Sequence, residues 1–150
     1  MDKSLKRVRK GLGTRLDGYP VKWKRDHDAY SEEQRAKITF DKNRYICFIF
    51  RYDRESHNLA GFMDIVTKDG RKDCYRRSYS FSDTIRKVGI PGFSDKDISL
   101  LKTAFLYERK DGLILSAIDP EIQAEIFLEA IKSALPGIIK QIEEEKEKGI

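Results

Sequence analysis

The sequence predicts an α+β protein: an antiparallel β-meander of about four to six strands, short helices, and a C-terminal amphipathic helix packed on one face of the sheet. Two observations carry this prediction. Over residues 36–81, apolar and polar side chains largely alternate with the period of β-strands. From residue 82 onward the period changes toward that of helices. A run of strands followed by helices is typical of an α+β domain.

The first 25 residues are expected to form a basic N-terminal arm or lead-in, and residues 26–150 a single α+β domain. A chain of 150 residues suits one domain with one core. The first 20 residues contain three glycines and a proline but few large apolar side chains, which is typical of a loose segment. A short helical face is the alternative there, formed by Leu5, Val8, Leu12 and Leu16.

Four strands are predicted in the middle of the chain, over residues 37–41, 45–52, 59–67 and 73–81. The second of them has apolar residues on both faces, which is usual for a central strand. Asp69-Gly70 lies between the third and fourth strands and is a strong hairpin signal, because a type I′ turn needs positive φ at both central residues. Ahead of the strands, residues 31–35 are expected to form one helical turn.

Two short helices are expected after the meander. Residues 82–88 begin with a serine that can cap the helix, and Gly89 ends it. A capping-box-like sequence at Ser94 starts the second helix, which runs to about Leu101. Over residues 105–118 we favour a second hairpin around Asp111-Gly112, and the alternative is that the second helix continues to about residue 110.

The C-terminal helix is expected to begin at Pro120, since a proline at the first helical position loses no hydrogen bond. Pro136-Gly137 is expected to end it, and a last helix is expected to follow. The apolar face of the helix that begins at Pro120 is predicted to pack against the sheet and form one core with it. The predicted core contacts join Ile46, Phe48, Phe50 and Ile65 to Ile122, Ile126 and Ile131.

Charge is unevenly distributed along the chain, whose formal net charge is +5 at pH 7. Residues 1–25 contain nine Lys or Arg and two Asp, so this segment has a net charge of +7. Residues 119–150 contain four Lys and eight acidic residues, which gives −4. A basic segment of this kind favours a polyanionic partner, whereas solvated surface is the simpler interpretation of the acidic end.

The compartment is predicted from what the sequence lacks. No apolar run approaches the roughly 20 residues of a membrane span, and the first residues show no apolar core of a secretory signal. Two cysteines are too few for a disulfide-rich secreted scaffold. We therefore expect a cytoplasmic protein, or a nuclear one in a eukaryote, with no membrane partner.

The best candidate site is a nucleic-acid-binding surface in the basic segment. Clustered cations favour phosphate backbones through counterion release, and an aromatic ring among cations suits base stacking. The alternative for Trp23 is a core anchor. The residues predicted to bind are Lys3, Lys6, Arg7, Arg9, Lys10, Arg15, Lys22, Trp23, Lys24 and Arg25.

The fourth predicted strand adds a second candidate surface. Alternation places Tyr75, Arg77 and Tyr79 on one face, and aromatic residues beside arginine form stacking platforms for single strands. The alternative is that the aromatic residues lie in the core. A helix-turn-helix over residues 82–104 is disfavoured, because its connection is long and its second helix begins with carboxylates.

No catalytic residue, metal site or cofactor is predicted. Asp26-His27-Asp28 is the tightest cluster of potential metal ligands, but no spacing motif surrounds it. The two cysteines and two histidines lack zinc-site spacing, and Gly11-Leu12-Gly13 matches neither a P-loop nor a dinucleotide fingerprint.

Three functions follow, in order of preference. The first is a small non-enzymatic nucleic-acid-binding protein that uses its basic arm together with the aromatic and arginine strand face. The second is a protein-interaction module, such as an inhibitor, an accessory subunit or a homo-oligomer, acting through the C-terminal helix or a sheet edge. The third is a metal-dependent nuclease with metal near Asp26 to Asp28 or Asp64.

Overall fold

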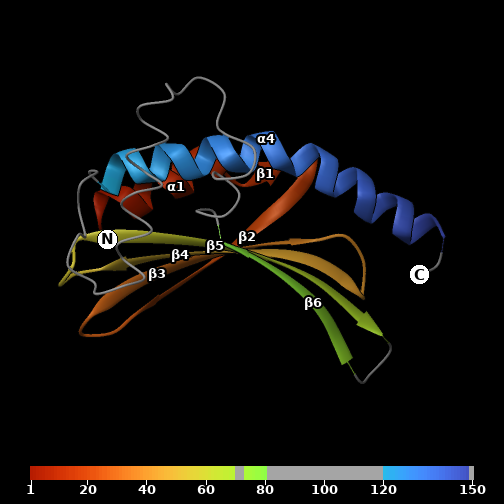
Figure 1. Cartoon of the computed structure of the whole chain (residues 1–150), viewed down its shortest axis with the longest axis horizontal. Helices are drawn as coiled ribbons and strands as arrows, with labels where there is room; N and C mark the ends of the chain where they lie inside the picture. Colours follow the sequence, from red (N-terminus) through yellow and green to blue (C-terminus); the bar gives the residue numbers. More distant parts are fainter. Residues whose placement is uncertain (70–72, 81–119, 149–150) are drawn as a thin grey trace.

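The computed structural model describes residues 1–69, 73–80 and 120–148. Six strands and two helices make up this part of the chain (Figure 1). In chain order they are α1 (Lys3–Leu12), β1 (Arg15–Leu16), β2 (Tyr19–His27), β3 (Ser31–Thr39), β4 (Arg44–Asp53), β5 (Asn58–Asp69), β6 (Asp73–Ser80) and α4 (Pro120–Glu147).

The strands form one antiparallel sheet in the order β1-β2-β3-β4-β5-β6, so each strand pairs with its neighbours in sequence. This confirms the predicted α+β meander. The four strands predicted over residues 37–81 are all present as β3 to β6. The two expected helices and the expected hairpin over residues 82–118 lie outside the described residues, as does the turn at residue 70.

The helical turn expected over residues 31–35 is wrong, because these residues begin strand β3. Asp28 explains the change: its Oδ1 accepts hydrogen bonds from the backbone N–H of Tyr30 at 2.7 Å and of Ser31 at 2.8 Å. The aspartate therefore closes a tight turn between β2 and β3. Pairing with strands on both sides then outweighs the weak local preference for a helix.

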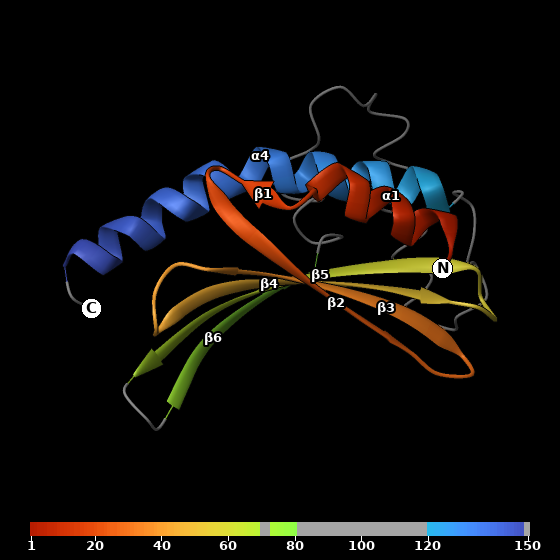
Figure 2. The same ribbon diagram turned by 180° about the vertical axis from the view of Figure 1, so that it is seen from behind.

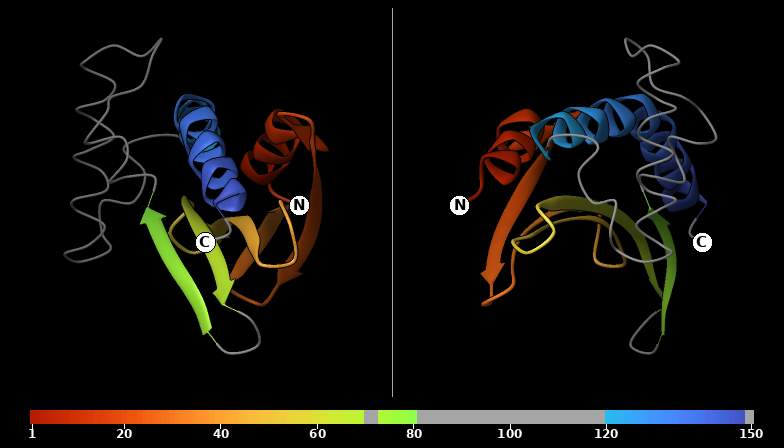
Figure 3. Two further views of the ribbon diagram at one scale, coloured as in Figure 1. Left: turned by 90° about the vertical axis from the view of Figure 1, so that its right-hand side faces the viewer. Right: turned by 60° about the vertical axis from the view of Figure 1, so that its left-hand side comes forward.

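Both helices lie on the same side of the twisted sheet, as the end-on view in Figure 3 shows. Seen from behind in Figure 2, α1 lies beside α4. The predicted core is confirmed for six residues: Ile46, Phe48, Phe50, Ile65, Ile126 and Ile131 are all buried. The prediction is wrong for Ile122, which is 50% exposed. Gln123, one position later in α4, is buried in its place.

α4 continues through Pro136, so the expected break there is wrong. A proline inside a helix removes one backbone hydrogen bond and bends the helix. Figure 1 shows the bend in α4. Leu135, Ile139 and Ile142 are buried on both sides of the proline, and this packing holds the two halves together as one curved helix.

The expected arm forms α1, β1 and most of β2. Asp2 caps α1, since its carboxylate accepts a hydrogen bond from the N–H of Ser4 at 2.8 Å. Leu5, Val8 and Leu12 are buried on one face of α1, so the alternative of a short helical face is confirmed for these three residues. It is wrong for Leu16, which lies in β1. Apolar residues spaced three and four apart thus dock this segment on the body of the protein.

Candidate nucleic-acid interface

Every cation of α1 is exposed on the surface. The helix buries its apolar side against α4 and the sheet, so the rest of its circumference is left for charged side chains. It contains no acidic residue. The exposed cations are Lys3, Lys6, Arg7, Arg9 and Lys10.

Four of these cations line a groove of about 590 Å³ between α1 and α4. Lys132 of α4 contributes a fifth cation, and Glu121 and Glu125 are the two carboxylates of the lining. Arg7 forms an ion pair with Glu125 across the groove. The other residues of the lining are Lys3, Lys6, Lys10, Gly11 and Leu128.

Gly11 allows the two helices to approach closely at this groove. A Cβ atom built there would come within 2.4 Å of the Leu128 side chain. Leu128 is buried and lines the groove, and its side chain would have to shift to make room. The glycine, seen in the sequence only as a sign of a loose segment, is therefore a packing residue of α1.

Trp23 points to the helix side of the sheet. Its indole Nε1 donates a hydrogen bond to the carbonyl of Gly13 at 2.7 Å. The guanidinium of Arg9 lies 5.7 Å from the centre of its ring. The indole is partly buried against the core, and it links β2 to the end of α1.

Lys22 and Lys24 are exposed and alternate with the inward-facing Val21 and Trp23 along β2, so they lie on the opposite face of the sheet. The structure therefore places seven of the nine predicted cations of residues 1–25 in two sets. One set lies on α1, and the other lies on the sheet face that α1 and α4 do not cover.

Arg15 and Arg25 belong to neither set. Arg15 is in β1, where its guanidinium donates to the carbonyl of Gly18 at 3.4 Å. Arg25 is exposed in β2, directly opposite the buried Gln34 of β3.

The aromatic and arginine strand is β6. Its backbone pairs with β5 so that Tyr75, Arg77 and Tyr79 stand opposite Thr67, Ile65 and Met63, respectively. The side chains of β6 lie outside the described part of the structure. Their proposed stacking role therefore stays a prediction.

Glu33 is the charged centre of the uncovered sheet face. Its carboxylate accepts hydrogen bonds from Arg35 at 2.7 Å and from Arg51 at 2.9 Å. Burial alone would raise the pKa of Glu33, but the two arginines outweigh it and hold that pKa below its ordinary value. Glu33 is thus ionised, and it neutralises part of the positive charge nearby.

The cluster Asp26-His27-Asp28 lies at one end of this face, beside a pocket of about 320 Å³ that Glu33, Arg35 and Arg51 also line. Hydrogen bonds from the backbone of Tyr30 and Ser31 lower the pKa of Asp28. The Asp28 carboxylate therefore has a structural task in the turn. Among the described residues, no group of three or more His, Cys, Asp or Glu could hold a metal ion.

Sequence reasoning missed several residues of these surfaces. Lys132 belongs to the groove but lies in a helix where its charge looked ordinary. The ammonium groups of Lys37 in β3 and Lys68 in β5 lie 4.2 Å and 5.7 Å, respectively, from the centre of the Tyr45 ring. Tyr45 is in β4, so three different strands contribute to this cluster. Alternation of Lys37 with Ala36 and Ile38 was a usable signal for its face, but only the strand pairing brings it to Tyr45.

Most apolar side chains of α4 are buried within the chain, and Ile122 is the exposed exception among its large ones. Phe127, Ile131 and Leu135 are among the α4 residues buried in the core. In the part of the chain that is described, no helix is both long and apolar enough to cross a membrane.

No protein-family model, curated protein or solved structure matches this chain. The chemistry of its surfaces is therefore the basis for assigning a function.

Proposed function

We propose that this protein binds nucleic acid, with the basic face of α1 and the adjoining groove as its main phosphate contact. The observation that carries the proposal is the placement of five exposed cations on one ten-residue helix that has no acidic residue. Three of them, Lys3, Lys6 and Lys10, form a stripe at helical spacing along the groove. Such a stripe matches the charge of a phosphate backbone.

The ordered helix supports this function in a different way from a mobile arm. The packing of Leu5, Val8 and Leu12 holds the helix in place before any ligand arrives. Binding therefore does not have to order this segment, and less of the interaction energy is lost as conformational entropy. Arg7 is already paired with Glu125, so the lysines of the stripe are the cations most available to a ligand.

Deleting residues 1–15 is a poor test of this proposal, because it would remove three core residues together with the charges. We propose instead the triple variant Lys3→Gln/Lys6→Gln/Lys10→Gln. The control is Lys42→Gln/Lys140→Gln/Lys148→Gln, which removes the same charge from exposed positions elsewhere. Both are compared with the wild type by filter binding to DNA and RNA between about 50 and 200 mM salt.

The stripe variant should bind more weakly, and the slope of log affinity against log salt should fall by about 2 for single strands and about 3 for duplexes. The control should keep most of the wild-type slope, because net charge alone does not define a contact surface. Equal effects of the two variants would contradict the assigned surface. Absence of wild-type binding to any of the nucleic acids would contradict the function itself.

A further inference from the structure

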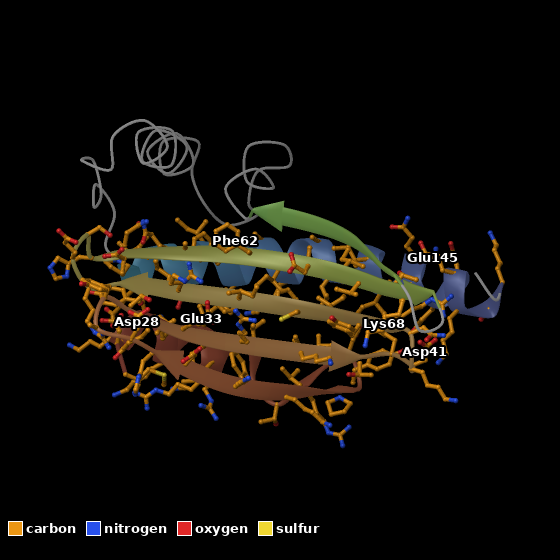
Figure 4. All side chains as sticks on the ribbon, turned by 90° about the horizontal axis from the view of Figure 1, so that it is seen from below. Asp28, Glu33, Asp41, Phe62, Lys68 and Glu145 are labelled. Atoms are coloured by element: carbon orange, nitrogen blue, oxygen red, sulfur yellow. The ribbon has the colours of Figure 1, made fainter. Side chains whose placement is uncertain are left out.

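The face of the sheet opposite the two helices has its own pattern of charge. Figure 4 looks onto this face and labels Glu33, Phe62 and Lys68. The strand register places Lys22 directly opposite Lys37, and Lys24 directly opposite Arg35. Two neighbouring cross-strand pairs of β2 and β3 thus join cations to cations.

Like charges placed directly opposite each other destabilise a sheet. Glu33 relieves part of this repulsion, since it pairs with Arg35 and with Arg51. Four lysines of this face form no ion pair with another described residue: Lys22, Lys24, Lys37 and Lys68. A surface that keeps repelling cations in register is complementary to an anionic ligand that would neutralise them.

Two aromatic side chains share this face with the lysines. Tyr45 of β4 is half-buried, and its ring lies 4.2 Å from the ammonium group of Lys37 and 5.7 Å from that of Lys68. Phe62 of β5 is 41% exposed. An aromatic ring between cations can combine base stacking with phosphate contacts.

We propose that this sheet face binds single-stranded nucleic acid, with a base stacked on Tyr45 and phosphates held by Lys22, Lys24 and Lys37. This inference rests on the proposed function and names its ligand class. The aromatic rings decide between single and double strands, because a base within a duplex is already stacked and has no free face to offer. Phosphate contacts alone, as on α1, do not make this distinction.

The two basic surfaces meet at strand β2. Trp23 and Arg9 lie on its helix side, while Lys22 and Lys24 lie on its other side. A flexible single strand can therefore follow the lysines of the open face around β2 to the cations of α1, whereas a stiff duplex cannot.

The first test compares Tyr45→Leu with Tyr45→Phe, which keeps the aromatic ring. Binding is measured to a thymidine oligonucleotide of about 20 nucleotides and to a duplex of equal length. Tyr45→Leu should lose about 10-fold in affinity for the single strand and little for the duplex, and Tyr45→Phe should bind both like the wild type. Equal losses for the two ligands, or none for either, would overturn the inference.

The second test uses Lys22→Gln/Lys24→Gln, since a half-buried tyrosine also contributes to packing. Both lysines are exposed and oppose other cations, so the variant should unfold at the same temperature as the wild type or higher. Its salt slope for the thymidine oligonucleotide should fall by about 1. A normal slope in this folded variant would show that the face does not contact the ligand.

The outcomes separate the two proposals. If the α1 stripe variant weakens binding but the sheet-face variants do not, the proposed function stands and this inference fails. If the sheet-face variants reduce single-strand affinity selectively, the inference holds. If the wild-type protein binds no nucleic acid, both fail together.

Discussion

Gln123 of α4 and Asn58 of β5 are both buried, and the amide Nε2 of Gln123 donates a hydrogen bond to Oδ1 of Asn58 at 2.8 Å. Oε1 of the same glutamine accepts a hydrogen bond from the backbone N–H of Leu59 at 3.0 Å. One amide side chain thus joins α4 to the start of β5. This pairing explains why α4 turns Gln123 inward and leaves Ile122 half-exposed.

Replacing this glutamine should destabilise the fold. Gln123→Ala removes the hydrogen bonds that Gln123 makes to the side-chain Oδ1 of Asn58 and to the backbone N–H of Leu59. Losing such a bond in a buried site costs about 1–3 kcal/mol for each group. We therefore expect a loss of about 3 kcal/mol in the free energy of unfolding, measured by urea denaturation. Gln141→Ala is the control on the same helix, and because its side chain is exposed it should change stability by less than about 0.5 kcal/mol.

Two glycines should respond to alanine in opposite directions. Gly137 is inside α4 and nothing lies within 4 Å of a Cβ built on it, so Gly137→Ala should stabilise by about 0.5–1 kcal/mol through helix propensity. Gly13 ends α1 with φ of 70° and ψ of −157°, a conformation that costs other residues about 1–3 kcal/mol. Gly13→Ala should therefore lower the midpoint of thermal unfolding, and Gly137→Ala should raise it. A stabilising Gly13→Ala would contradict this description of the helix end.

The N-terminal helix should behave as part of the core. Leu5 is fully buried, so Leu5→Ala is expected to cost about 2–5 kcal/mol. Lys6→Ala, next to it on the exposed side, should be nearly neutral. Circular dichroism during denaturation measures both variants. If Leu5→Ala were as mild as Lys6→Ala, α1 would not be docked in solution.

Stability should depend on pH through Glu33. Its pKa is lower in the folded protein than the ordinary value of 4.5, so it stabilises the fold at neutral pH. This contribution begins to decline as the pH falls to the ordinary value and disappears below the folded-state pKa. The stability gap between the wild type and Glu33→Gln should therefore be largest near pH 7 and should close on acidification. A gap that widens at low pH would contradict the ion pairs with Arg35 and Arg51.

High salt should narrow the same gap at neutral pH. Arg35 and Arg51 have side chains that are 48% and 55% exposed, respectively, so mobile ions reach them easily. Denaturation of the wild type and of Glu33→Gln in low and high salt at pH 7 measures this gap. The glutamine amide can keep part of the hydrogen bonding to the arginines, so the part of the gap that salt removes is the charge interaction that mobile ions screen.

Strands β3 to β6 were predictable because their signal is local, whereas β1 and β2 were not predicted. The order of residues shows alternation over 37–41 and 73–81 and an apolar run over 45–52, and each side chain of a strand has one of only two faces to occupy. The helix at residues 3–12 was predictable only as an alternative, because its glycines look like breakers until Leu128 is seen packing against Gly11. The continuity of α4 through Pro136 was not predictable, since it depends on buried contacts on both sides of the bend.

The features of the candidate site also fall into those that the sequence determined and those that only the tertiary structure decided. The sequence by itself determined that cations concentrate in the first 25 residues. Only the structure decided that Lys22 and Lys24 share one face of strand β2. Only the tertiary structure decided that Trp23 is turned toward Arg9, and that Lys37 and Lys68 gather at Tyr45. Charge and alternation are properties of neighbours in the chain. The pairing of strands and the docking of helices join residues far apart in sequence, and these contacts depend on how the whole chain packs.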